Sequence, residues 1–519
     1  MFWAFLCVND SELIMIKRIA IVGGGTAGWL AANHLGHALV GSGIEITLIE
    51  SPTIPTIGVG EGTVPSMRNS LKKFGISETD FINECDVTFK QSIKFVNWLD
   101  KSKHGSNFYH HLFDHPHVFG EQLTDAWLGQ SSDSDYASFV SKQHACCEHN
   151  LAPKTIATPE YAGVNGYAYH FDAKKFAAFL GRHAQKQFAV KHRYAEIEEV
   201  ITDQDGYITQ LIDTDGNATA FDFIIDCSGF SAAFIGQKLG VGYIDKSDYL
   251  LTDTAITIQV PTNPEQEIPP YTIATAHQAG WIWDIALTQR RGVGLVYSSK
   301  YMTEEQALVK LHRYLGNQFT HLTPRKIPIK VGRREKMWHK NCVAIGLSQG
   351  FVEPLEATAI LIADFSANLL SKRFPRCRAD IALIADDYNR QVNYVWEQTF
   401  DFIKMHYCVS DRTDSGFWRE NRNKTQISDK LKYNLARWQR FAPQREDFES
   451  KFDLFDLENY LYVLFGMKYL PTLNTGHSDN MAHEQLTQLK QQRVNQLLAE
   501  LPTHRALLAK IKMFGMQKY

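Results

Sequence analysis

The sequence has few cysteines and no long apolar run, and each shortage excludes a class of protein. Eight cysteines occur in 519 residues, and only Cys146 and Cys147 lie close together. There is thus neither a disulfide framework nor a CxxC motif for a metal or redox centre, which favours a reducing cytoplasm. No stretch approaches the roughly eighteen consecutive apolar residues that a membrane-spanning helix needs. We expect neither a disulfide-rich secreted module nor a membrane protein.

Clusters of one charge sign are absent as well. The net charge is −3, and lysine and arginine are spread along the chain. No basic stripe is left for nucleic acid or for an anionic membrane surface. Internal repeats and low-complexity tracts are also lacking. Because 44% of the residues are hydrophobic, the chain can bury a large core. Because no surface for nucleic acid or a membrane is indicated, a small-molecule ligand is the expected partner.

The chain divides into three parts by pattern. Residues 1–14 lack the basic start and cleavage site of a signal peptide, and Met15 follows directly, so we interpret them as an extension outside the fold. Residues 15–400 are expected to form an α/β body, with an irregular insertion near 100–165. Residues 401–519 are mostly helical and charged. Whether the insertion and the helical module meet to form a substrate lid is left open.

A nucleotide-binding pattern opens the body. Residues 17–22 predict a buried strand, GGGTAG follows, the next residues repeat apolar positions at helical spacing, and residues 44–49 predict a second strand. A strand, helix and parallel strand in succession are typical of a Rossmann-type α/β sheet.

The glycines of this pattern have a chemical use. Gly23, Gly25 and Gly28 have the GxGxxG spacing that lets a pyrophosphate approach the N-terminus of a helix. Glu50 ends the second strand, where an acid can accept hydrogen bonds from a ribose hydroxyl. We favour an adenine dinucleotide over a purely structural glycine turn.

Two later segments indicate which dinucleotide binds. DCSGF follows the strand predicted over 221–226, and AIGLSQGF overlaps the end of the strand predicted over 341–346. Both resemble flavin-contacting segments of the flavoprotein monooxygenase fold, which implies FAD. No second glycine motif of comparable quality remains for NAD(P)H, so the flavin must arrive reduced or be reduced by a separate protein.

The stretch FKQSIKFVNW, residues 89–98, places Lys90 and Lys94 among aromatic and branched side chains. Read as one strand, it puts both lysines on the same face. On its own, this stretch favours a solvated face, or alkyl stems lying along apolar surface with their ammonium groups in water.

Together these motifs resemble the flavin-dependent tryptophan halogenases, from about residue 16 to at least residue 466. The matching segments are GGGTAGWLAA, GVGEGTVP, FKQSIKFVNW, NFYHHLF, AYHFDA, GWIWDIAL and GFVEPLEATAI. The resemblance implies a flavoprotein-monooxygenase-like body with a helical substrate-side module. It also implies the chemistry: reduced FAD and oxygen give a flavin hydroperoxide, chloride or bromide attacks it, and hypohalous acid reaches an essential lysine beside an aromatic substrate. A separate NAD(P)H-dependent flavin reductase is implied as partner.

The resemblance assigns cofactor contacts and a catalytic pair. Lys90 matches the essential lysine, which hydrogen-bonds hypohalous acid or forms a haloamine. Glu356 matches the neighbouring carboxylate, suited to polarising the halogenating species or to taking a proton from the arene cation; the alternative is a helix-start acid favoured by the helix dipole. Lys94 and Glu353 are expected to be structural. The implied FAD contacts are Gly23, Gly25, Thr26, Ala27, Gly28, Glu50, Gly58, Gly60, Glu61, Asp226 and Gly346.

Other matched positions depart from the family pattern. Trp281 and Trp283 match the tryptophans that flank the flavin, although ordinary core packing would explain them alone, and Ala286 replaces the usual proline. The backbone N–H groups of Thr358 and Ala359 match the halide site at a helix start. Alanine replaces the usual glycine at Ala359 and the common serine just before Thr358, which leaves the halide preference open.

The substrate is the least determined part. His110 matches an aromatic-pocket residue, with a satisfied structural histidine as the alternative, and Phe455 falls near a family tryptophan. The usual anchors for an amino acid's ammonium and carboxylate are not visible. Because a buried zwitterion without partners is costly, indole or another less charged, electron-rich arene is expected.

Two rival functions stay open at this stage. One is a flavin monooxygenase that hydroxylates an organic substrate and uses Lys90 only structurally. The other is an FAD-binding module with a decayed active site, which the three alanine departures favour. No metal site is expected, and a homodimer is left open.

Overall fold

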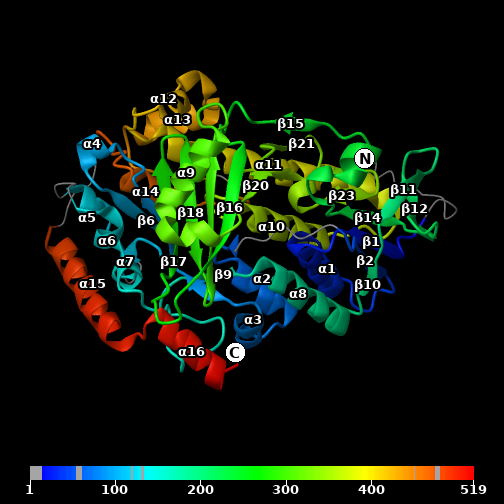
Figure 1. Ribbon diagram of the computed structural model, residues 1–519, viewed down its shortest axis with the longest axis horizontal. Helices are drawn as coiled ribbons and strands as arrows, with labels where there is room; N and C mark the ends of the chain where they lie inside the picture. Colours follow the sequence, from blue (N-terminus) through cyan, green and yellow to red (C-terminus); the bar gives the residue numbers. More distant parts are fainter. Residues whose placement is uncertain are drawn as a thin grey trace, which may run out of the picture.

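The structure, a computed structural model, describes residues 14–53, 61–118, 121–129, 134–448, 450–473 and 480–518 (Figure 1). Gly58 and Gly60, two of the expected FAD contacts, lie outside the described residues, as do residues 1–13. Within the described ranges, no helix is both long enough and apolar enough to cross a membrane.

A six-stranded sheet contains the N-terminal βαβ unit. Its strand order is β10–β2–β1–β14–β23–β22, and all neighbours are parallel except β22 with β23. This arrangement confirms the Rossmann-type prediction. The strands are β1 (Arg18–Val22), β2 (Glu45–Glu50), β10 (Lys191–Tyr194), β14 (Phe223–Asp226), β22 (Trp338–His339) and β23 (Cys342–Ala344).

Both faces of this sheet are covered, as expected for a parallel sheet. On one face, α1 (Thr26–Ala38) packs between α8 (Ala173–Phe188) and α10 (Thr358–Lys372). On the other, Ala20 of β1 packs with Ile208 of the hairpin strand β12 (Ile208–Asp213). β12 pairs with β11 (Ile197–Thr202) and β13 (Ala218–Ala220) in a separate three-stranded sheet.

A seven-stranded mixed sheet carries the second half of the body. Its order is β20–β16–β19–β18–β17–β5–β6, with only β17 and β5 parallel. The strands are β5 (Ser92–Val96), β6 (Phe108–Leu112), β16 (Thr254–Pro261), β17 (Tyr271–His277), β18 (Gly280–Ala286), β19 (Arg290–Tyr297) and β20 (Arg325–Pro328). It places WIWDIA on β18, two strands away from the lysine segment on β5.

The lysine segment is not one strand, and that prediction was wrong. β4 (Thr88–Lys90) pairs with β9 (Ala168–Phe171), which also pairs with β3 (Glu61–Gly62), whereas β5 belongs to the mixed sheet. The chain changes sheets at Gln91, whose N–H donates to the Pro270 carbonyl at 2.7 Å. Because the strand is interrupted, Lys90 and Lys94 enter different surroundings.

Helices dominate the C-terminal part, as predicted. The boundary expected at residue 400 falls inside α11 (Ile381–Cys408), so the body and the helical part share a continuous 28-residue helix. Later helices are α12 (Gly416–Asn421), α13 (Asp429–Trp438), α14 (Leu457–Gly466), α15 (Asn480–Glu500) and α16 (His504–Phe514).

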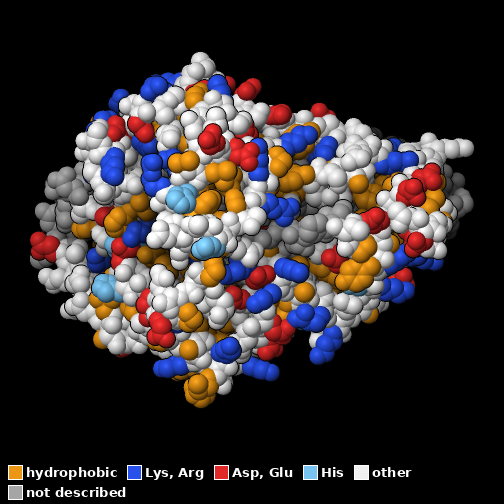
Figure 2. Space-filling view, viewed as in Figure 1, with side chains coloured by type: hydrophobic (Ala, Val, Ile, Leu, Met, Phe, Trp, Pro, Cys, Tyr) orange, Lys and Arg blue, Asp and Glu red, His pale blue; other side chains and the backbone are white. Residues whose placement is uncertain are grey.

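The insertion and the C-terminal helices are neighbours, a point that the sequence left open. The insertion forms α5 (Thr124–Gly129), α6 (Tyr136–Val140) and α7 (Gln143–Glu148). α6 packs on α14 and α7 on α15, and the ring of Trp127 lies 5.2 Å from that of Phe465. On the visible face of the molecule, basic and acidic side chains are interspersed (Figure 2).

Candidate active site

The glycine turn forms one end of a cavity of about 830 Å³. Gly23 has φ of +123°, and a Cβ there would stand 2.1 Å from the Cys227 carbonyl oxygen. A Cβ at Gly25 would meet no atom within 4 Å, so that side of the turn is open. The turn is followed directly by α1, whose first N–H groups are free to bind an anion. This open cradle fits a dinucleotide pyrophosphate.

The other predicted cofactor residues divide into two groups. Those that line the cavity are Gly23, Gly25, Thr26, Ala27, Glu50, Glu61 and Gly346. Gly28 does not line it, but a Cβ there would lie 1.9 Å from the Gly23 carbonyl oxygen. Gly28 therefore permits close packing of α1 against the turn.

Asp226 is a buried structural acid. It is 0% exposed and does not line the cavity. Its carboxylate accepts backbone N–H groups from Ser228 at 3.0 Å, Phe234 at 3.1 Å and Ile235 at 2.9 Å. Asp226 thus fixes the turn after β14, and its direct contact with a cofactor stays a prediction.

Lys90 lies on the wall of the same cavity. It is 1% exposed, its Nζ donates to the Thr63 carbonyl at 3.0 Å, and the Nζ lies 5.3 Å from the centre of the Phe113 ring. Burial lowers the pKa of Lys90 to about 8, and the charge of Glu356 partly opposes this shift. At neutral pH, Lys90 is a buried ammonium group facing the cavity.

Lys94 has an ordinary structural environment. Its Nζ donates to Glu148 at 2.6 Å and lies 4.0 Å from the centre of the Phe108 ring. Lys94 is not among the cavity-lining residues.

Glu356 is held by two histidines. It is 2% exposed, and its Oε1 lies 3.0 Å from Nδ1 of His111 on β6 and 2.9 Å from Nε2 of His406 on α11. Burial alone would raise the pKa of Glu356, but the two histidines outweigh burial and lower it to about 2. Glu356 is therefore an anion across the physiological range.

Glu353 anchors one of the tryptophans. Its Oε1 accepts from the Tyr407 hydroxyl at 2.5 Å and from Nε1 of Trp281 at 3.2 Å, and its Oε2 accepts from the Thr252 hydroxyl. Burial raises the pKa of Glu353 to about 7, although these hydrogen bonds oppose the shift.

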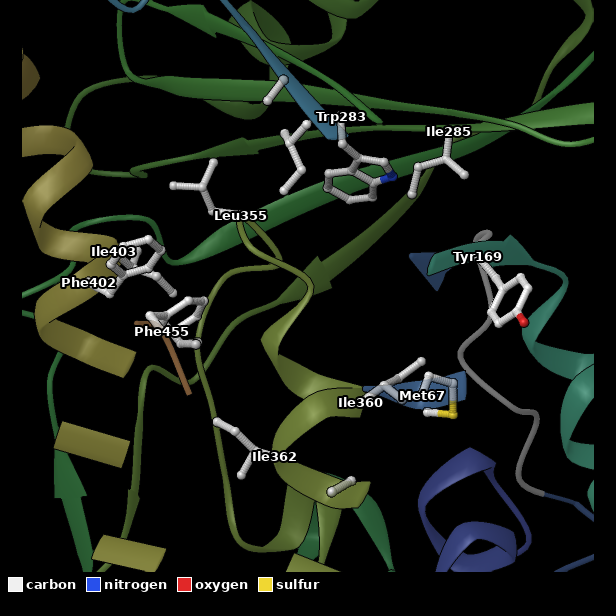
Figure 3. Packing of buried hydrophobic residues seen from close by; sticks show 14 of the residues in the cluster. Met67, Tyr169, Trp283, Ile285, Leu355, Ile360, Ile362, Phe402, Ile403 and Phe455 are labelled. Atoms are coloured by element: carbon white, nitrogen blue, oxygen red, sulfur yellow. The ribbon is translucent and has the colours of Figure 1, made fainter. Parts of the chain in front are cut away.

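The two tryptophans of β18 have different roles in the structure. Their ring centres are 6.1 Å apart. Trp283 lines the cavity, opposite Ile360 of α10, whereas Trp281 is held by Glu353 and does not line it (Figure 3).

The predicted halide site lies at the start of α10. Ala357, just before the helix, has a left-handed backbone with φ of +57°, and no side chain caps the helix. Thr358 is fully buried, and its Oγ1 has no hydrogen-bond partner in the described part of the chain. Ala359 lines the cavity. Free N–H groups and an unpaired hydroxyl at the end of a fifteen-residue helix fit a small anion.

The predicted pocket residue His110 lies on the face of β6 away from Glu356. It is 0% exposed, with Nδ1 2.9 Å from the Ser92 hydroxyl and Nε2 2.9 Å from Glu148. Its neighbour His111 makes the contact with Glu356 instead, because successive strand residues face opposite sides. Phe455 stacks on Phe402 of α11, with ring centres 3.9 Å apart (Figure 3).

Sequence analysis missed three residues that organise the site: His111, His406 and Tyr407. The last two lie in FIKMHYC near the end of α11, where a histidine and a tyrosine interrupt an apolar run. Polar side chains in a buried helix need hydrogen-bond partners. This need is the sequence signal that could have identified His406 and Tyr407.

Comparisons with known proteins identify relatives of the whole chain. The family model described as tryptophan halogenase matches residues 18–483. Tryptophan 7-halogenase RebH of Lentzea aerocolonigenes is 35% identical over 88% of this chain and 90% of its own length. Tryptophan 6-halogenase ThaL of Streptomyces albogriseolus is 32% identical over the same shares. The crystal structure of a tryptophan halogenase from Shewanella frigidimarina superposes with a TM-score of 0.93, at 37% identity over 97% of this chain and 99% of that one.

Proposed function

Because the chain belongs to the tryptophan halogenase family, we propose that Lys90 and Glu356 are the catalytic residues of this FAD-dependent halogenase. The enzyme uses FAD, a halide and a tryptophan-like arene, and it depends on a separate flavin reductase. When bound in its reduced form, FAD supplies hypohalous acid from oxygen and halide. The residues of the chain then direct that oxidant.

The position of Lys90 carries the proposal. Lys90 and the glycine turn line one cavity, so an oxidant made at the cofactor can reach the lysine without leaving the protein. The ammonium group uses one N–H on the Thr63 carbonyl, which leaves two to hydrogen-bond the oxygen of hypohalous acid. The halogen is thereby presented at one place.

Glu356 complements Lys90. A buried carboxylate that stays ionised stabilises positive charge as it develops on the arene and can take the ring proton afterwards. The first N–H groups of α10, at Thr358 and Ala359, are proposed to bind the halide. FAD is proposed to bind at Gly23, Gly25, Thr26, Ala27, Glu50, Glu61 and Gly346, between the glycine turn and Trp283.

The proposed substrate is indole or a similar arene with little charge. His111, Phe402 and Phe455 surround the Glu356 side with aromatic rings, which favours a flat apolar molecule. The insertion and the C-terminal helices, which pack on one another, are proposed to cover it. Assembly as a homodimer and a cytoplasmic location stay predictions.

The rival hydroxylase is not favoured, because the relatives are halogenases. Mass spectrometry of products from a panel of indoles and phenols tests the proposal. Each arene is incubated with the protein, FAD, a flavin reductase, NADH and bromide or chloride. We expect a halogen isotope pattern with the wild type and with Lys94→Ala.

The Lys90→Ala variant should lose at least about a hundredfold in product, while FAD binding and consumption of oxygen persist. Normal halogenation by Lys90→Ala would refute the role of Lys90. Oxygenated products without halogen would instead support the hydroxylase.

A further inference from the structure

The partners of His406 define its protonation. Its Nδ1 lies 2.9 Å from the Phe402 carbonyl oxygen, and its Nε2 lies 2.9 Å from Oε1 of Glu356. A carbonyl oxygen and an ionised carboxylate can only accept hydrogen bonds. Both ring nitrogens must therefore carry hydrogen, which makes the ring a cation.

His111 has the opposite arrangement. Its Nδ1 faces Oε1 of Glu356 at 3.0 Å, and its Nε2 faces Nδ2 of Asn459 at 3.0 Å. The Asn459 amide is oriented by its Oδ1, which accepts the N–H of Asp456 at 3.0 Å. Its NH₂ group therefore donates to Nε2, which must be without hydrogen. His111 is neutral, with its hydrogen on Nδ1.

The surroundings of His406 suit a buried cation. The side chain is 0% exposed, and the ring centres of Phe95, Trp98 and Phe402 lie 5.2, 6.1 and 5.1 Å from its own. Packing among these rings keeps water away from the contact between His406 and Glu356, which strengthens their electrostatic attraction. Titratable groups on the elements around it include Glu356 before α10, Lys90 on β4, Lys94 on β5, three residues of β6 (Tyr109, His110 and His111) and four of α11 (Asp401, Lys404, Tyr407 and Cys408).

We propose that His406 is a positioning residue, held as an imidazolium cation, that keeps Glu356 ionised and fixes its Oε1, so that Oε2 serves the reaction. This inference rests on the proposed role of Glu356. Both bonds from the histidines end on Oε1, and no donor to Oε2 lies among the described residues.

One consequence concerns the proton that the arene releases. When the C–H bond breaks, its electron pair returns to the ring, and the proton passes to Oε2 of Glu356. The histidine nitrogens that face Glu356 already carry hydrogen, so neither can accept this proton. The proton therefore leaves from Oε2, without a relay through the histidines.

A matched pair of variants separates charge from hydrogen bonding. His406→Gln places a neutral N–H donor where Nε2 stands, and His111→Asn places one where Nδ1 stands. Each retains a donor to Glu356, but only His406→Gln removes a charge. Halogenation kcat and KM are measured from pH 3 to 8, with reductase and bromide in excess.

We expect the wild type to have no acid limb in this range. In His406→Gln, the pKa of Glu356 should rise by about 1–3 units, because an opposite charge shifts a carboxyl pKa by about that much. The kcat of this variant should therefore fall as the pH drops toward the raised pKa. KM for the arene should change less than kcat. The acid limb of His111→Asn should stay where the wild-type limb is, whatever its rate. An unmoved limb in His406→Gln, or equal shifts in both variants, would overturn the proposal.

Neutron diffraction reads the protonation directly. Crystals exchanged into D₂O at neutral pH should show deuterium on both ring nitrogens of His406 and only on Nδ1 of His111. A single deuterium on His406 overturns this inference while leaving the roles of Lys90 and Glu356 intact. Conversely, full activity of Glu356→Gln would remove the proposed function without changing the diffraction result.

Discussion

The surroundings of Glu353 and of Glu356 are two regions of one loop with opposite effects on a buried carboxylate. Around Glu353, the donors are hydroxyl and indole groups, and burial still raises its pKa to about 7. Around Glu356, two histidines lower the pKa to about 2 despite equal burial. Neutral donors satisfy lone pairs but do not compensate for the loss of water, whereas a cation does.

The difference suits two separate tasks. Glu353 holds Trp281 and Tyr407 in place, and when it is neutral its Oε1 can still accept their hydrogen bonds. Glu356 keeps its charge beside Lys90, where positive charge develops during electrophilic substitution. Three residues of separation in EPLE are enough to place the two side chains among different elements.

The largest expected effect comes from removing the charge of Glu356. Glu356→Gln should lower halogenation kcat by about 10²–10⁴-fold, the range for a group that assists proton transfer. Glu353→Gln, the matched change, should stay within about tenfold of the wild type, because an amide resembles the neutral acid. Steady-state product formation by liquid chromatography measures both. Equal losses would abolish the distinction between the two regions.

The charge of Glu356 also bears on the pH dependence of Lys90. If the ammonium form binds hypohalous acid, kcat should fall as the pH rises through about 8, the pKa of the buried lysine. A rise of kcat through the same pH would instead indicate a neutral amine and the haloamine route. The profile is measured with the reductase in excess, so that flavin supply does not limit the rate.

The two carboxylates should affect stability in opposite directions. The folded-state pKa of Glu353 is raised above 4.5. The stabilising contribution of this carboxyl to the free energy of unfolding is therefore present below pH 4.5 and is lost as the pH rises through about 7. Ionisation then costs up to about 3 kcal/mol, from 1.36 kcal/mol per pKa unit. The contribution of Glu356 is present above pH 4.5 and is lost as the pH falls through about 2.

Calorimetry of the variants tests this contrast. The Tm of the wild type relative to that of Glu353→Gln should fall between pH 5 and 8. The Tm of the wild type relative to that of Glu356→Gln should be constant from pH 5 to 6, well above the pKa of Glu356. A constant difference for Glu353 would mean that the Glu353 carboxyl has an ordinary pKa in the folded protein.

The smallest effect is expected from one donor to Glu353. Tyr407→Phe removes the hydroxyl that Glu353 accepts and should cost about 1–3 kcal/mol of stability, because a buried acceptor loses a partner. Tyr433→Phe is the control, since Tyr433 is 65% exposed. Thermal unfolding followed by fluorescence measures both variants. A Tm for Tyr407→Phe that equals the control would contradict the anchoring role of Tyr407.

Much of the nucleotide-binding half could be predicted from sequence. The strand, glycine turn, helix and second strand are consecutive, so local pattern and spacing identify them. Asp226 is the exception, since its carboxylate caps backbone N–H groups a few residues further on. The resemblance to a family supplied Lys90 and Glu356, which composition alone would have left as an ordinary strand lysine and a helix-start acid.

The substrate half was harder, and the reasons are geometric. His110 and His111 are adjacent, and a shift of one residue along a strand exchanges the faces. His406 lies fifty residues from Glu356 in sequence, on a helix whose apolar pattern indicates only burial. The break at Gln91 depends on pairing with Pro270, which no local pattern reveals.

The sequence by itself determined the class of fold, the cofactor turn and the residues available for catalysis, because these depend on local periodicity and on side-chain chemistry. Only the tertiary structure decided how those residues are charged. The ionisation of Glu353, Glu356 and Lys90 depends on burial and on donors brought from distant strands and helices, and electrostatic interactions of this kind act through space rather than along the chain.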